Sequence, residues 1–262
     1  MDTNDVRAAA RQAGDNPALL AAARVGFAVN GLLHLVIAWL GFQLALGGTG
    51  GSADQSGALQ TLASTALGRV LLWVAVLGFL ALAVWQATEA IVAKRELKDK
   101  VKSAATGVLY LFLSFSCLNW ARGSAGSSST QQSVDFTASL MGKPAGRLLV
   151  AALGLAIIGI GAYFAVKGWR RTFLEDLVGH PGRLVERMGR IGYVAKGVAL
   201  VLVGLLFVLA AIHGAPGEAT GLDGALRSLL AAPYGPFLLI AVSFGFAAYA
   251  VYCGARAQHP KL

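Results

Sequence analysis

The chain has 262 residues, of which 56% are apolar and 13% are charged, and its formal net charge is +9. Soluble domains carry about 25% charged residues, so this chain has too few charges to cover a surface exposed to water. The same balance excludes disordered, collagen-like, disulfide-rich and coiled-coil classes.

Six apolar segments are long enough to cross a membrane. A hydrocarbon core about 30 Å thick requires about 20 apolar residues in a helix, and a helix satisfies its backbone groups internally. In chain order the segments are Val25–Leu46, Val70–Ala93, Val101–Ala121, Leu148–Val166, Ile191–Ile212 and Phe237–Gly254. The first segment is longer than a signal-peptide core and is expected to be retained. The predicted fold class is all-α, a polytopic membrane protein with six transmembrane helices.

The basic residues predict the orientation of the chain. Sixteen Lys and Arg residues lie in the N-terminal segment, between spans two and three, between spans four and five, and after span six, whereas the opposite side carries five. The positive-inside rule then places both termini in the cytoplasm. Anionic inner-leaflet lipids are expected partners. A nucleic-acid partner is not expected, because the basic residues flank spans instead of gathering with aromatic residues on one face.

Two short motifs recur along the chain. Arg24–Gly31 resembles Arg190–Gly197, and Lys100–Gly107 is a weaker copy. Each copy precedes an apolar helix. A second motif in the outer loops, Gly57–Leu62, recurs as Gly224–Leu229. Recurrence of this kind indicates a repeat architecture.

The spacing within the copies is nearly constant. It is 37 residues from Gly31 to Gly68, 39 from Gly107 to Gly146, and 38 from Gly197 to Gly235. Each copy is predicted to be a helix, an outer loop with a short amphipathic helix, and a second helix. An even number of spans gives every copy the same orientation, so we predict three parallel two-helix repeats with pseudo-threefold symmetry about the membrane normal.

The domain limits follow from these repeats. They are 1–23 for a cytoplasmic N-terminal segment, 24–94 for repeat 1, 95–168 for repeat 2, 169–189 for a basic amphipathic cytoplasmic linker, 190–256 for repeat 3 and 257–262 for a cytoplasmic tail. Within the linker, Trp169–Val178 is expected to be a helix that lies either on the inner leaflet or against the bundle. Gly154, Gly159, Gly161 and Gly245 are expected to let neighbouring helices approach closely.

The motif residues resemble a known family. Asp54–Leu59, Arg190–Gly197, Gly221–Leu226 and Pro233–Pro236 are similar to a bacterial three-repeat, six-helix membrane family known as domain of unknown function 1206. The resemblance covers about residues 20–256. It implies a multi-pass protein of the bacterial cytoplasmic membrane, and it implies no activity.

Ionisable side chains inside the spans are candidate functional residues, because inserting one costs at least about 2.5–3.5 kcal/mol at mid-depth. His34 lies near the midplane, and Glu89 and Lys196 lie closer to the cytoplasmic boundary. The repeat alignment groups Asn30 with Thr106 and Lys196, Glu89 with Lys167 and Arg256, and His34 with Tyr110 and Leu200.

Two interpretations of these residues remain open. In the functional one, they line a polar vestibule on the cytoplasmic side, with His34 above it as a proton-responsive group or a solute ligand. In the structural one, Glu89 pairs with Lys196, Lys167 or Arg256, and His34 forms a hydrogen bond with a carbonyl group.

The sequence predicts no cofactor and no enzymatic activity. No two His residues share one depth for a haem, and neither Cys has a neighbour at metal-ligand spacing. The glycine-rich stretch 47–52 lacks the Lys-Ser/Thr end of a phosphate loop. The outer hydroxyls at 127–129 are expected to lie in a flexible linker.

We therefore expect a non-catalytic membrane module that packs with lipids or other membrane proteins. The alternative is a conduit or transporter for a small solute, ion or proton. No span has an interior Pro, so the broken helices of many transporters are not indicated, which favours the module.

Overall fold

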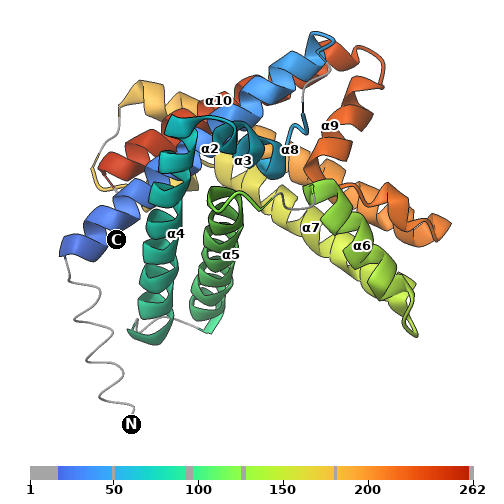
Figure 1. Cartoon of the computed structure of the whole chain (residues 1–262), viewed down its shortest axis with the longest axis horizontal. Coiled ribbons are helices and arrows are strands. Elements are labelled where there is room, and N and C mark those ends of the chain that lie inside the picture. Colours follow the sequence, from blue (N-terminus) through green and yellow to red (C-terminus); the bar gives the residue numbers. More distant parts are fainter. Residues whose placement is uncertain (1–16, 49–50, 93–96, 125–127, 180–181, 260–262) are drawn as a thin grey trace. The chain divides into compact units, whose positions relative to one another are not determined.

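The computed structural model describes residues 17–48, 51–92, 97–124, 128–179 and 182–259, and all regular elements within them are helical. Six of the helices are long and apolar enough to cross a membrane. They are α2 (Pro17–Ala45), α4 (Ala66–Val92), α5 (Leu97–Ala121), α7 (Gly146–Trp169), α8 (Arg183–His213) and α10 (Gly235–Gln258), as Figure 1 shows. The predicted all-α fold with six spans is confirmed.

A short helix lies between the two spans of each repeat, as expected. These helices are α3 (Gln55–Ala63), α6 (Ser129–Met141) and α9 (Gly221–Leu230). We predicted that residues 127–129 lie in a flexible linker. This was wrong for Ser129, which is the first residue of α6. The Ser128 side chain caps it by accepting a hydrogen bond from the backbone N–H of Gln131.

The linker between α7 and α8 does not contain the α-helix that we expected over Trp169–Val178. Trp169 ends α7, and a single 3-10 turn, η1 (Thr172–Asp176), follows it. Phe173 is fully buried there, with its ring centroid 5.3 Å from those of Tyr193 and Tyr252. Of the two placements, packing against the bundle is therefore correct.

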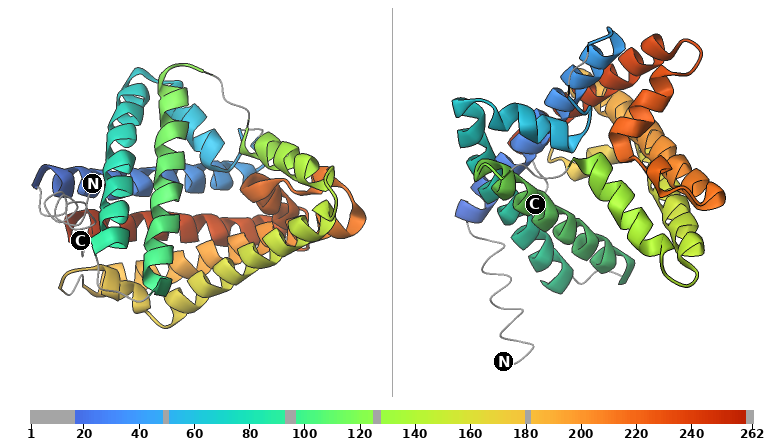
Figure 2. Two further views of the ribbon diagram at one scale, coloured as in Figure 1. Left: turned by 90° about the horizontal axis from the view of Figure 1, so that it is seen from below. Right: turned by 45° about the vertical axis from the view of Figure 1, so that its right-hand side comes forward.

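The chain forms two compact units. The α4–α5 unit comprises Met1–Asn30, Thr61–Ala125 and Cys253–Leu262, and the α7–α8 unit comprises Gly31–Gln60 and Gly126–Tyr252. Within them, α4 lies side by side with α5, and α7 with α8 (Figures 1 and 2).

The packed pairs of spans join different repeats. Helix α4 is the second span of repeat 1 and α5 is the first span of repeat 2, and α7 and α8 join repeats 2 and 3 in the same way. Helices α10 and α2 join repeats 3 and 1: Asn30 contacts Cys253 in the α4–α5 unit, and the rings of His34 and Tyr249 lie 4.7 Å apart in the α7–α8 unit. Each pair thus combines the second span of one repeat with the first span of the next.

The α4–α5 and α7–α8 pairs pack in the same register. The Ser114 hydroxyl donates a 2.9 Å hydrogen bond to the Val76 carbonyl. The repeat-equivalent residues in the other pair are Gly204 and Gly154, whose backbones approach so closely that a Cβ on Gly204 would lie 2.6 Å from the Gly154 oxygen. The contact between repeats therefore recurs at equivalent positions. The symmetry axis itself stays a prediction.

Small residues determine how closely α7 and α8 approach. A Cβ on Gly161 would lie 2.7 Å from the Gly197 carbonyl oxygen, and one on Gly154 would lie 2.8 Å from that of Gly204. Gly245 likewise faces Ala195. The close-packing prediction is confirmed for these three residues. It was wrong for Gly159, whose Cβ would have no neighbour within 4 Å.

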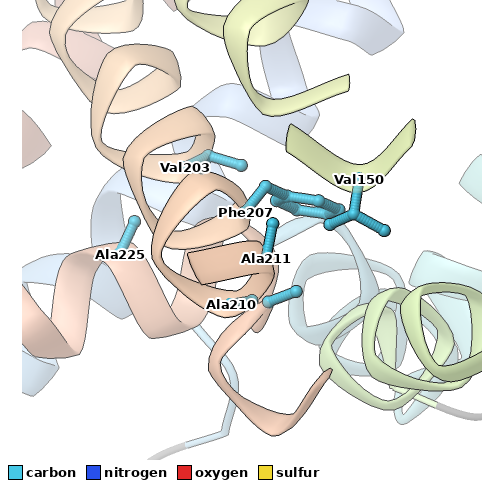
Figure 3. Packing of buried hydrophobic residues seen from close by; sticks show 7 residues of the cluster. Val150, Val203, Phe207, Ala210, Ala211 and Ala225 are labelled. Carbon is cyan, nitrogen blue, oxygen red and sulfur yellow. The ribbon is translucent and has the colours of Figure 1, made fainter. Parts of the chain in front are cut away.

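The C-terminal half of α8 forms an apolar core with α7 and α9. Val203 and Phe207 of α8 are buried with Val150 of α7 and Ala225 of α9. Figure 3 shows the Phe207 ring beside Val150, at the start of α7. This core fixes the outer end of the α7–α8 pair and attaches α9 to it.

The glycine at the end of each repeat spacing is required for a steric reason. Gly68, Gly146 and Gly235 begin the second span of each repeat, and a Cβ on any of them would overlap a backbone carbonyl oxygen at the end of the preceding short helix. A side chain therefore cannot be accommodated where the chain turns from the short helix into the span.

Candidate functional site

The histidine and the lysine predicted inside the membrane lie together in the α7–α8 unit. Lys196 Nζ on α8 lies 3.4 Å from His34 Nε2 on α2. An ammonium group there donates to the imidazole when Nε2 is unprotonated. Both side chains are half-buried. Two titratable groups from different repeats therefore share one site.

Aromatic rings surround this pair. Lys196 Nζ lies 4.4 Å from the ring centroid of Tyr249 and 5.5 Å from that of Phe164. The His34 ring lies 4.7 Å from that of Tyr249 and 6.1 Å from that of Phe246. The negative face of an aromatic ring stabilises a nearby cation, by about 2 kcal/mol when water is excluded. We call these five residues the His34–Lys196 cluster.

A second polar cluster lies where α7, α8 and α10 meet the linker. Lys167 Nζ forms a 2.6 Å ion pair with Asp176 Oδ2, and both side chains are largely buried. The Tyr252 hydroxyl lies 3.3 Å from the same carboxylate oxygen and 3.1 Å from the Phe173 carbonyl oxygen, so its one proton is shared between two acceptors. Tyr193 OH lies 3.5 Å from Asp176 Oδ2. These five residues form the Asp176 cluster.

Tyrosine rings connect the two clusters. Tyr249 lies 5.2 Å from Tyr193 and 5.9 Å from Tyr252, measured between ring centroids. Phe246, Tyr249 and Tyr252 are three residues apart, so they lie along one face of α10. That spacing could have been found in the sequence, but it was not singled out.

Asp176 was also missed. From the sequence, we considered Glu89 as the acidic partner of Lys167. In the structure the partner of Lys167 is Asp176, nine residues after it in the chain. The signal in the sequence was the acidic pair Glu175-Asp176, which follows Phe173 and Leu174 in an otherwise basic linker. Glu89 itself lies in α4, and its side chain is outside the part of the chain that the structure describes.

The remaining predicted site residues belong to the α4–α5 unit. Asn30 Nδ2 lies 3.5 Å from Cys253 Sγ, and the Arg256 guanidinium lies 4.3 Å from the ring centroid of Phe27. These contacts join α2 to α10.

Two further members lie on α5 in the same unit. The buried Tyr110 ring stacks on Phe79 at 6.0 Å, and Thr106 is half-buried. The structure thus brings together His34 and Lys196, with Lys167 in the adjoining Asp176 cluster, and places the other four described members among residues of their own unit.

The His34–Lys196 cluster can donate hydrogen bonds, stabilise a cation and exchange a proton between an amine and an imidazole. Within the described ranges, no group of three His, Cys, Asp or Glu side chains is arranged to hold a metal ion. Cys117 and Cys253 are both buried, and neither forms a disulfide bond.

Comparison with known proteins identifies three matched segments. The model of the family described as Domain of Unknown Function (DUF1206) matches residues 25–93, 101–171 and 191–258, which correspond to the three predicted repeats. The chain is also 24% identical over 243 residues to the uncharacterized protein YxxB of Bacillus subtilis (strain 168), covering 87% of this chain and 86% of that protein. No solved structure matches the chain.

Proposed function

Because the chain belongs to the DUF1206 family, to which no activity is attached, we propose its function from its geometry: it is a non-catalytic membrane module that packs with lipids or other membrane proteins. The observation that carries this proposal is the pairing of His34 with Lys196. The two side chains, from α2 and α8, contact each other and aromatic rings from α7 and α10, which is an arrangement suited to joining helices.

The other polar contacts support the same role. Lys167 and Asp176 tie α7 to the linker, and Asn30 and Cys253 tie α2 to α10. In lipid, interhelical hydrogen bonds contribute to association, and apolar side chains do not distinguish a neighbouring helix from lipid. The polar contacts therefore add to the close packing that holds these spans together.

The outward-facing side chains suit a lipid environment. Exposed large residues such as Trp39, Leu77, Phe112 and Leu155 occur along the spans. Soluble monomeric proteins rarely expose large contiguous apolar surfaces to water. These exposed apolar side chains are suited to contact with the hydrocarbon chains of lipids.

The cytoplasmic end of α7 suits anionic headgroups. Trp169 is exposed, and the Arg190 guanidinium lies 4.5 Å from its ring centroid. Arg170, Arg183 and Arg187 are exposed on the same stretch of chain. A Trp at the boundary with nearby Arg residues is typical of an interfacial anchor. We place this end, and both termini, at the cytoplasmic face of a bacterial plasma membrane.

A variant that replaces the polar pair with apolar residues tests the module. His34→Leu uses the residue found at the repeat-equivalent position 200, and Lys196→Met keeps a long apolar side chain. Replacing a buried polar pair by apolar residues of similar volume is often neutral in stability. We expect the double variant to retain its abundance, its thermal stability and its pattern of cross-linked neighbours in membranes, whereas His34→Leu alone lowers the stability by about 1–3 kcal/mol.

A second function, a conduit for protons or a small solute, is favoured by one specific observation. Two titratable groups contact each other within the spans of the α7–α8 unit. Vesicles containing the purified protein and a pH-sensitive dye distinguish the two functions. The module predicts proton flux equal to that of empty vesicles, for wild type and double variant alike. Flux in the wild type that the well-folded double variant lacks would contradict the module and establish the conduit.

A further inference from the structure

The three short helices form a polar cluster of their own in the α7–α8 unit. The Ser56 hydroxyl oxygen of α3 accepts a 3.0 Å hydrogen bond from the backbone N–H of Ser129, at the start of α6. Asp223 Oδ1 of α9 accepts a 2.7 Å hydrogen bond from the backbone N–H of Ala53, just before α3. Each of these side chains therefore satisfies a backbone donor at the start of another repeat's short helix.

The charges of this cluster do not balance. Asp223 is buried, and its Oδ2 is neutralised by Arg227 Nε at 2.8 Å. Asp54 is only 1% exposed. Its Oδ1 accepts hydrogen bonds from the Ser56 hydroxyl, at 2.7 Å, and from the Gly57 N–H, at 2.9 Å. Hydrogen bonds from neutral groups leave the Asp54 charge in place, so the three charged groups carry one net negative charge.

The second oxygen of Asp54 is the unusual feature. Asp54 Oδ2 is buried and has no hydrogen-bond partner among the described residues. A buried carboxylate oxygen is ordinarily hydrogen-bonded, paired with a cation or coordinated to a metal, because removing it from water is costly. We therefore expect a hydrogen-bond donor or a cation to be bound at Asp54 Oδ2.

Oxygen atoms of α6 supply further potential ligands. Thr130 Oγ1 and Thr137 Oγ1 are also buried without a partner among the described residues, and Thr137 is 0% exposed. Thr130 follows Ser129, whose N–H is bonded to Ser56, and Ser56 is bonded in turn to Asp54. Ser56 thus links Asp54 directly to the residue that precedes Thr130.

We propose that this cluster is a binding site for a monovalent cation of the sodium type, with Asp54 Oδ2 and the Thr130 hydroxyl as protein ligands. Hard cations prefer carboxylate and hydroxyl oxygens, and a single positive charge balances the single negative charge of the cluster. A water molecule would satisfy the hydrogen bonds but would leave that charge uncompensated. The cation holds α3 against α6, so it stabilises the contact between repeats 1 and 2.

Thermal unfolding of the purified full chain in detergent tests the site. At equal ionic strength, we expect the midpoint temperature to be higher in sodium or potassium chloride than in choline chloride, and to rise with the logarithm of the cation concentration. Isothermal titration with sodium chloride is expected to give one site per chain. Identical midpoints in all three salts would overturn the proposal and would indicate a proton or water at Asp54 instead.

Three variants separate the site from general stability. Asp54→Asn keeps a side-chain oxygen that can accept the hydrogen bonds from Ser56 and Gly57, but it removes the charge. It is expected to abolish the response to the cation. Thr130→Val removes only a hydroxyl and is expected to raise the half-maximal cation concentration about tenfold. Ser64→Ala, at an exposed position just after α3, is the control, because it leaves all three charged groups in place: it is expected to keep the cation response. A response that survives in Asp54→Asn would also overturn the proposal.

Discussion

The close approach of α7 and α8 predicts that alanine substitutions at two nearby glycines, Gly161 and Gly159, differ strongly in their effect on the free energy of unfolding. In Gly161→Ala, the new Cβ would lie 2.7 Å from the Gly197 carbonyl oxygen and 2.8 Å from the Val201 nitrogen. Both neighbours are backbone atoms, which cannot rotate away, so the two helices must separate. Overpacking of this kind costs about 1–3 kcal/mol.

The same substitution two residues earlier is the matched control. Gly159 is on the same helix, and its Cβ would have no neighbour within 4 Å. Gly159→Ala therefore gains about 0.5–1 kcal/mol, because alanine loses less backbone entropy than glycine in a helix. For Gly161→Ala this gain offsets only part of the overpacking, so we expect a net loss of about 1 kcal/mol.

Equilibrium unfolding in mild detergent with increasing sodium dodecyl sulfate measures both free energies, with tryptophan fluorescence as the signal. We expect the two alanine variants to differ by about 1–3 kcal/mol, with Gly159→Ala the more stable. Equal stabilities would show that the α7 and α8 backbones do not lie in contact at Gly161.

Two further predictions concern buried side chains. Ser56→Ala leaves a backbone N–H of α6 without its acceptor, so it is expected to lower the unfolding free energy by about 1–3 kcal/mol. Ser64→Ala, at an exposed position, is the control. It is expected to change the unfolding free energy by less than about 0.5 kcal/mol in the same experiment. The Cys117 and Cys253 side chains are thiols that are at most 1% exposed, so neither is expected to react with a maleimide until the protein is unfolded. Mass spectrometry that finds either one modified in the native protein would contradict their burial.

The spans and repeats could be predicted from sequence because each rests on a local property. An apolar run of about 20 residues fixes a span, and steric contacts at Gly68, Gly146 and Gly235 explain the motif that marks each repeat. The contact between His34 and Lys196 could be anticipated only as a shared location inside the membrane, because the two residues are 162 positions apart.

The pairing of spans between repeats was not predictable by the same reasoning. It depends on which apolar faces match in shape, and Gly154 meets Gly204 through backbone contact that hydrophobicity does not reveal. The role of Asp176 was hidden for a similar reason. Its partner Lys167 is close in the chain, but the two tyrosines that approach the same carboxylate come from α8 and α10.

Labelling of single cysteines in spheroplasts tests the membrane topology most directly. In a cysteine-free background, Tyr234→Cys places a thiol at an exposed position between α9 and α10, and Arg170→Cys places one at the exposed end of α7. A membrane-impermeant maleimide is expected to label Tyr234→Cys in intact spheroplasts and to label Arg170→Cys only after permeabilisation. Labelling of Arg170→Cys from outside, or protection of Tyr234→Cys, would contradict six crossings with both termini inside.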